Sequence, residues 1–348
     1  MDCSDPILKN YSIASKGYSI LVNHNGKDNL ECSGGFIEDL NFEYSVNTLY
    51  DLASLTKVLC TLPLTLILLD RNIITLRDTL GSLDLFEEYP NIRKLNFENL
   101  LTHTSGLIPD KNLWELGKKR EDYLRGIEVE AANANPYTEE LYSDLNFILL
   151  GLALERIYGK TLDEVFKDEI ADKINLKFTG FNPKFSKEII APTEITIDRG
   201  LIWGKVHDEK SYYLGGVAGH AGLFSTAREI LKILNAMRNG ILFSRKTFDL
   251  SIINRNSYAG GIFGLGWMIK TPRFEKISKS YDLTAFMGDY SPIGTIGHTG
   301  FTGTSILLDE SHDLTIVLLT NRVYPTRQSE GILRFRRIIH NRIYRDIF

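Results

Sequence analysis

Residues 49–57 read Leu-Tyr-Asp-Leu-Ala-Ser-Leu-Thr-Lys and lead directly into an apolar run over residues 58–69. This run is too short to cross a bilayer, which requires about 20 apolar residues, so it predicts a buried helix. We expect that helix to span residues 54–70 and to begin at the turn that carries Ser54. Because positions i and i+3 share one face of a helix, Ser54 and Lys57 are expected to meet.

Strand signals lie on both sides of this helix. Residues 17–25 are typical of a strand that ends in an Asn-Gly turn, and residues 30–37 would complete a hairpin. Beyond about residue 258 the chain returns to short, turn-bounded strand segments, which are 264–270, 294–297, 303–309 and 314–321.

Helical patterns fill the middle of the chain and its end. They cover residues 145–157, 162–174 and 227–239, and apolar residues recur at helical spacing between Ile332 and Ile343. This order predicts an α/β protein of the α+β type, in which both ends of the chain form one antiparallel sheet flanked by helices. The sheet domain is expected to comprise residues 1–78 and 241–348, with residues 79–240 as a mostly helical inserted domain.

Composition excludes several classes of function. The chain has 348 residues, 43% of them hydrophobic, and a net charge of −4, which gives no bulk attraction to nucleic acid. Three scattered cysteines are too few for a disulfide framework, and no His or Cys spacing indicates a metal site. We therefore expect no cofactor, no metal, no nucleic-acid partner and no membrane span. The polar, acidic N-terminus lacks the features of a secretory signal and predicts a cytoplasmic location.

The Ser54-x-x-Lys57 pair carries the first candidate chemistry. A serine hydroxyl is a weak nucleophile until a neighbouring base takes its proton. A lysine can do so only as the free amine, which requires desolvation or nearby positive charge to lower its pKa. Taken alone, the pair also fits a helix-capping serine with an exposed lysine.

Two further motifs extend the candidate site. Tyr142-Ser143-Asp144 precedes a helix, and a tyrosine at such a junction can shuttle a proton. His298-Thr299-Gly300 lies in a glycine-rich strand segment whose N–H groups can approach a ligand. Taken alone, these motifs also fit a capping loop and a tight strand turn.

The three motifs in this order resemble those of the serine β-lactamase-related superfamily, which includes class C β-lactamases, DD-peptidases and β-lactamase-like carboxylesterases. The resemblance extends to residues 100–107, which read Leu-Leu-Thr-His-Thr-Ser-Gly-Leu, and to residues 219–225 and 318–321. It covers nearly the whole chain from about residue 17.

The resemblance implies a role for each matching residue. Ser54 would be the nucleophile and Lys57 its hydrogen-bonded base partner. Tyr142 would protonate the leaving group and later help to activate water. Which of Lys57 and Tyr142 acts as the base in each step is left open. The backbone N–H groups of Ser54 and Phe301 would hold the oxyanion.

The substrate-binding residues implied in the same way are Asp144, His298, Thr299 and Gly300. Two of them depart from the β-lactamase pattern, because Asp144 replaces an asparagine and His298 replaces a lysine. Both changes favour an esterase or a peptidase over an efficient β-lactamase, and the first expectation is an acyl-enzyme carboxylesterase acting on small esters. The alternatives are a D-amino-acid or DD-type peptidase, a weak class C-like β-lactamase and a non-catalytic binding protein; the oligomeric state stays open.

Three further expectations concern basic residues outside these motifs. His103 is expected to order a loop or a helix end, and a structural role is favoured for His220 over one at the pocket. The arginines of the C-terminal helix are expected to form a solvated face; they are Arg334, Arg336, Arg337, Arg342 and Arg345.

Overall fold

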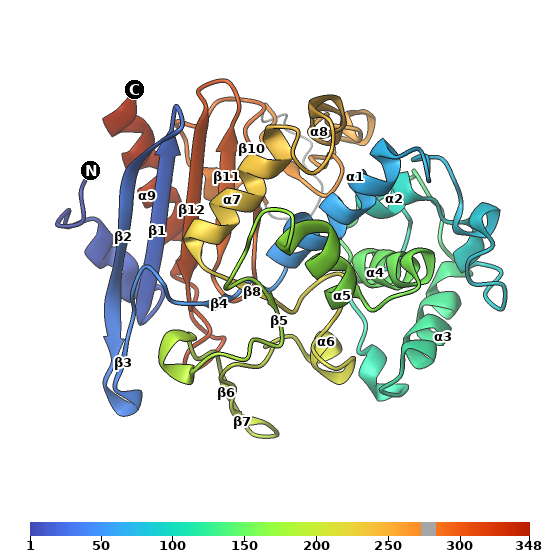
Figure 1. Ribbon diagram of the computed structural model, residues 1–348, viewed down its shortest axis with the longest axis horizontal. Coiled ribbons are helices and arrows are strands. Elements are labelled where there is room, and N and C mark those ends of the chain that lie inside the picture. The colour runs from blue at the N-terminus through green and yellow to red at the C-terminus, as the bar shows by residue number, and fades with distance from the viewer. Residues whose placement is uncertain (273–282) are drawn as a thin grey trace.

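The computed structural model describes residues 1–272 and 283–348 and contains a seven-stranded antiparallel sheet, which lies at the left in Figure 1. The strand order is β3-β2-β1-β12-β11-β10-β9. Its strands are β1 (Gly17–His24), β2 (Lys27–Ile37), β3 (Phe42–Glu43), β9 (Met268–Ile269), β10 (Ile296–Thr299), β11 (Ser305–Asp309) and β12 (Leu314–Thr320). Strand β1 pairs with β12, so both ends of the chain meet in one sheet, as predicted.

The described part of the chain contains nine α-helices. They are α1 (Leu62–Asp70), α2 (Phe97–Leu101), α3 (Arg120–Ala131), α4 (Asp144–Tyr158), α5 (Leu162–Phe166), α6 (Glu209–Tyr213), α7 (Ala227–Arg238), α8 (Arg245–Ser251) and α9 (Ile332–Ile347). None of the described helices is both long and apolar enough to cross a membrane. The division into two domains at residues 78 and 240 stays a prediction.

The two faces of the sheet bury different helices. Side chains alternate along a strand, so Val317 and Leu319 of β12 join the core that contains α1 and α7. Leu318, between them, packs instead in the cluster that contains Phe335 and Ile339 of α9. Helix α9 therefore covers one face of the sheet, and α7 covers the opposite face (Figure 1).

A smaller sheet pairs the segment before Ser54 with strands from the middle of the chain. Its order is β4-β8-β5, where β4 is Tyr50–Asp51, β8 is Leu223–Ser225 and β5 is Gly180–Phe181. Strands β6 (Ile195–Thr196) and β7 (Gly200–Leu201) form a separate hairpin.

The helix expected over residues 54–70 is less regular than predicted. Residues 54–56 lie in a turn and at the start of the helix, Lys57–Thr61 form a π-helical turn, and α1 follows. Such π-helical turns are frequent at functional sites. The expectation of a solvated arginine face on α9 is wrong for Arg336, which is only 4% exposed.

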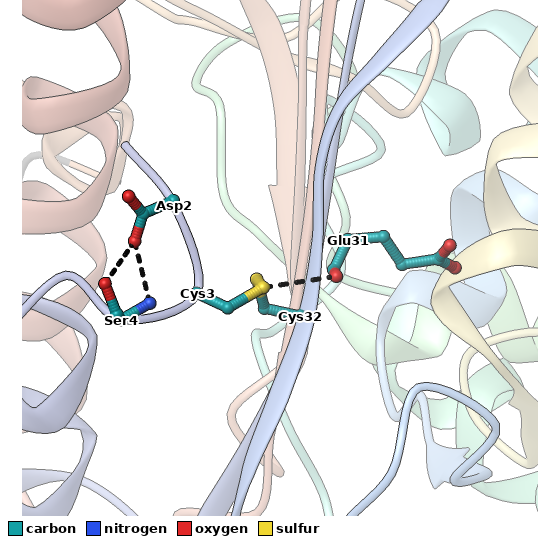
Figure 2. Close-up of a disulfide and its surroundings, with 5 residues drawn as sticks. All are labelled: Asp2, Cys3, Ser4, Glu31 and Cys32. Atoms are coloured by element: carbon teal, nitrogen blue, oxygen red, sulfur yellow. Dashed lines mark hydrogen bonds between the residues drawn. A yellow bond between two sulfur atoms is a disulfide. The ribbon is translucent and has the colours of Figure 1, made fainter.

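Cys3 and Cys32 form a disulfide, although the sequence had predicted no disulfide framework (Figure 2). Their Cα atoms lie 5.6 Å apart, within the usual range for a bridge. The bridge joins the N-terminal segment to β2, whereas Cys60 is a buried free thiol.

Candidate active site

Ser54 lies immediately after a constrained turn. Ala53 has φ 47°, in the left-handed region that non-glycine residues rarely adopt. The buried Asp51 carboxylate supports this turn by accepting hydrogen bonds from the N–H of Ala53 at 2.9 Å and of His207 at 2.6 Å. Burial raises the pKa of Asp51, although these two N–H groups oppose that effect. The turn leaves Ser54 partly exposed beside the buried Lys57.

Lys57 bridges the nucleophile and the second motif. Its Nζ donates to Ser54 Oγ at 2.9 Å and to Asp144 Oδ1 at 2.7 Å. The same Nζ lies 4.9 Å from the centre of the Tyr142 ring. Lys57 is fully buried, which excludes the exposed lysine that the motif alone also allowed.

The charge environment of Lys57 differs from the one expected. Burial lowers the pKa of Lys57, as required for a free amine, but the Asp144 carboxylate and then Tyr142 together outweigh burial, and the net direction of the pKa is upward. The resting form of Lys57 is therefore an ammonium that is paired with a carboxylate. A serine hydroxyl that accepts a hydrogen bond from a cation is itself easier to deprotonate.

The loop of residues 100–107 supports the Tyr142 motif. His103 Nδ1 accepts a hydrogen bond from the N–H of Ser143 at 3.1 Å and lies 3.2 Å from Asn146 Nδ2. The His103 ring is 4.6 Å from the Tyr142 ring, and burial keeps its pKa well below the usual value. His103 is thus a neutral, buried residue that orders the start of α4, as expected.

A second lysine, which sequence analysis missed, contacts Asp144. Lys210 Nζ lies 3.2 Å from Asp144 Oδ2, 2.8 Å from Asp110 Oδ1 and 3.6 Å from Asp208 Oδ2. His220 Nε2 lies 2.8 Å from Asp208 Oδ1, and its structural role stays a prediction. The site therefore contains a network of alternating charges.

This network stabilises its charged forms. Burial acts to raise the pKa of Asp144, but Lys57 and then His220 and Lys210 outweigh it, and the pKa falls well below its usual value. Burial acts to lower the pKa of Lys210, but Asp208 and Asp144 outweigh it and raise that pKa. Asp144 is consequently a carboxylate held between two ammonium groups.

Asp144, Asp208 and His220 also have the spacing of metal ligands, since their candidate ligand atoms lie within 4.8 Å of one another. Lys57 already forms an ion pair with Asp144, and Lys210 forms ion pairs with both Asp144 and Asp208. The donor set therefore fits an ion-pair network, and no reaction step is assigned to a metal here.

The third motif is bonded to the turn before Ser54. Thr302 Oγ1 donates to the Asp51 carbonyl at 2.7 Å, and Thr304 Oγ1 donates to the Leu52 carbonyl at 3.0 Å. A Cβ on Gly300 would lie 2.4 Å from the Leu52 oxygen, so only glycine permits this close approach.

The two proposed oxyanion donors are both free. The N–H groups of Ser54 and Phe301 donate no hydrogen bond to any residue in the described ranges. The Phe301 side chain is exposed, its ring lies 5.7 Å from that of His207, and the Arg322 guanidinium lies 4.3 Å from the centre of the Phe301 ring.

His298 is buried rather than open to solvent. Its Nδ1 lies 2.9 Å from the Thr299 carbonyl, and its Nε2 has no partner in the part of the chain that is described. Burial, followed by the charge of Lys57, lowers the pKa of His298 to about 3. The imidazole is therefore neutral, and its ring lies 5.9 Å from that of Tyr142.

The structure thus brings Ser54, Lys57, Tyr142 and Asp144 into one cluster, with His298 against Tyr142. Thr299 and Gly300 precede the turn that is bonded to Asp51 and Leu52. Lys210, Asp110 and Asp208 were missed because no local motif marks them and their partners are distant in sequence.

Comparisons with known proteins agree with this arrangement. The model of the Beta-lactamase family matches residues 8–340. A Salmonella agona protein named "Putative D-alanyl-D-alanine carboxypeptidase" is 31% identical over 311 residues, which cover 80% of this chain and 70% of that protein. These matches confirm the resemblance that the motifs indicated.

Solved structures show the same fold. EstCE1, described as a hydrolase with promiscuous acyltransferase activity, has a TM-score of 0.72 at 21% identity and 97% coverage of both chains. A penicillin-binding protein from Bacillus halodurans has a TM-score of 0.72 at 17% identity, covering 99% of this chain and 98% of that one. The predicted β-lactamase/transpeptidase-like fold is confirmed.

Proposed function

The chain belongs to the Beta-lactamase family of serine hydrolases, and we propose that it cleaves its substrate through an acyl-enzyme on Ser54. The observation that carries this proposal is the 2.9 Å hydrogen bond between Lys57 Nζ and Ser54 Oγ. It places a group able to exchange a proton directly on the candidate nucleophile.

In the proposed acylation, Ser54 Oγ attacks the carbonyl carbon and the carbonyl electron pair moves onto oxygen. The free N–H groups of Ser54 and Phe301 stabilise the resulting oxyanion. The serine proton passes to the amine form of Lys57, and Tyr142 delivers a proton to the leaving oxygen as the bond to carbon breaks. Water then cleaves the acyl-enzyme by the reverse proton transfers.

We propose a small carboxylic ester as the substrate. The neutral His298 provides no cation for a substrate carboxylate at the position where the β-lactamase motif pattern has lysine. Asp144 is already bonded to Lys57 at 2.7 Å and offers no amide to a β-lactam. Both features favour an uncharged ester over a β-lactam.

A D-alanyl-D-alanine carboxypeptidase activity is the second candidate. It is favoured by relatives named "Putative D-alanyl-D-alanine carboxypeptidase" at 31% identity, a higher identity than the 21% of EstCE1. Such a substrate carries a terminal carboxylate, which requires a cation elsewhere in the site.

Three substrates separate these proposals: a p-nitrophenyl ester, an N-acylated peptide ending in D-Ala-D-Ala, and a chromogenic cephalosporin. Ester turnover that is lost in Ser54→Ala, with little release of D-alanine, supports the esterase. Release of D-alanine at a higher kcat/KM than ester cleavage supports the carboxypeptidase. Ser54-dependent cephalosporin hydrolysis as the fastest reaction would contradict both.

A further inference from the structure

Arg336 of α9 is a buried cation that the proposed mechanism does not use. It is 4% exposed, although its helix neighbours Arg334 and Arg337 are exposed. Arg337 and Arg342 reach the carboxylates of Asp289 and Asp5. Within residues 1–272 and 283–348, no carboxylate forms an ion pair with Arg336.

Arg336 bonds instead to the backbone of the turn that carries Phe301. Its Nη2 donates to the Thr304 carbonyl at 2.6 Å and to the Gly300 carbonyl at 3.2 Å. The N–H of Gly300 also donates to the Thr304 carbonyl at 2.7 Å, which closes the turn. Arg336 Nε is buried and has no partner among the described residues.

One of these contacts lies on the peptide unit that includes the proposed oxyanion donor. The Gly300 carbonyl and the Phe301 N–H belong to the same planar amide, joined by a C–N bond of partial double-bond character. A cation bonded to the oxygen draws electron density from the nitrogen, which makes the N–H a stronger donor. Hydrogen-bonded groups polarise one another in this way, most strongly where the dielectric constant is low.

The lack of a counter-ion also requires an explanation. Burying a charge is unfavourable unless it is paired. Burial, and then the neighbouring Arg322, lower the pKa of Arg336 to about 9, so the group is still a cation at neutral pH. A negative charge that develops on the far side of the Gly300–Phe301 amide would be the missing compensation.

We propose that Arg336 is a positioning residue that holds the turn of residues 300–304 and polarises the Gly300–Phe301 peptide toward the oxyanion. The proposal rests on the proposed acyl-enzyme mechanism at Ser54. It places the effect of Arg336 in the transition state, where the oxyanion forms, rather than in substrate binding.

The test compares Arg336→Gln, which retains hydrogen-bond donors without the charge, with Arg336→Lys, which retains the charge. Ile339→Ala is the matched control, because Ile339 is buried on the same helix and lies outside the turn. Removal of a whole oxyanion donor typically lowers kcat by about 100- to 1,000-fold. For a weakened donor we expect kcat of Arg336→Gln on a p-nitrophenyl ester to fall by about 10- to 100-fold.

The split between kinetic constants identifies the role. KM should stay within about threefold, and Arg336→Lys should recover most of the lost kcat. Affinity for phenylboronic acid, which forms a tetrahedral anion on an active serine, should fall in parallel with kcat. Ile339→Ala should lower the melting temperature but not kcat at 25 °C.

Three results would overturn the inference: an Arg336→Gln kcat within threefold of wild type, equal losses in Arg336→Gln and Arg336→Lys, or an equal loss in Ile339→Ala. If Arg336→Gln does not fold, the uncharged Arg336→Met takes its place: a kcat within threefold of wild type overturns the inference, and a reduced kcat at constant KM supports it. If the wild type never acylates Ser54, the proposed function and the inference are both overturned. If the wild type acylates Ser54 and the kcat of Arg336→Gln is unchanged, only the inference is overturned.

Discussion

Asp144 Oδ1 accepts a hydrogen bond from Lys57 Nζ at 2.7 Å, and this ion pair determines the resting charge of the candidate base. The carboxylate opposes the effect of burial and raises the pKa of Lys57. The amine form, which the proposed acylation requires, is therefore scarce at neutral pH and increases as the pH rises. Four predictions follow from this cluster and its neighbours.

Lys57→Ala should lower kcat/KM on an active ester by about 1,000- to 10,000-fold, by analogy with loss of a triad base. The variant loses both the proton acceptor and the partner of Asp144. Steady-state kinetics measure the change, and circular dichroism checks the fold. A loss smaller than about tenfold, equivalent to roughly 1.4 kcal/mol, would remove Lys57 from the mechanism.

Asp144→Asn should move the alkaline-rising limb of the kcat/KM profile to lower pH by about one unit or more. The substitution removes the largest influence that opposes burial, so the pKa of Lys57 falls. The pH profile of ester cleavage measures the midpoint. Asp168→Asn is the control, because Asp168 pairs with Lys160 at the surface. A midpoint that stays or rises would mean that Lys57 is not the titrating base.

Lys210→Met should move the same limb in the opposite direction, by about half a pH unit or more. Lys210 Nζ lies 3.2 Å from Asp144 Oδ2, and its removal leaves more uncompensated negative charge near Lys57, which raises the pKa of that lysine. Lys160→Met, in an exposed ion pair, is the matched control. A midpoint shifted downward would contradict the charge assignment.

His298→Lys should improve the use of esters that carry a carboxylate over neutral esters by about tenfold, equivalent to roughly 1.4 kcal/mol. The substitution introduces a cation where the present side chain is neutral, with its pKa lowered to about 3 by burial. The ratio of kcat/KM values for paired esters measures the effect, and His298→Gln is the uncharged control. An unchanged ratio would exclude this position from substrate selection.

Much of the fold could be predicted because it depends on local patterns. Strand β1 and helix α9 have clear strand and helical patterns, and their boundaries follow these patterns closely. Strand β9 is shorter than the segment predicted at 264–270, because most of that segment forms turns around Gly264 and Gly266.

The site was only partly predictable. Ser54 and Lys57 are three residues apart, so helical geometry brings them together. Lys210 and Asp144 meet only through tertiary packing, and no motif marks that lysine. Arg336 has the same residue type as its exposed neighbours, so its burial depends on how α9 packs on the sheet.

The Cys3–Cys32 bridge is a similar case, because a pair of cysteines 29 positions apart has no distinctive spacing. Disulfides persist mainly in oxidising compartments. The predicted cytoplasmic location stays a prediction. Thiol labelling of the native protein before and after reduction would show whether Cys3 and Cys32 are bridged.

Intact-protein mass spectrometry after treatment with a fluorophosphonate probe tests the central claim most directly. An activated serine attacks phosphorus and releases fluoride, so we expect one adduct per chain, mapped by peptide analysis to Ser54. The adduct should be absent from a folded Ser54→Ala variant. No adduct, or an adduct on another residue, would contradict the proposed nucleophile and favour a non-catalytic binding protein on the same fold.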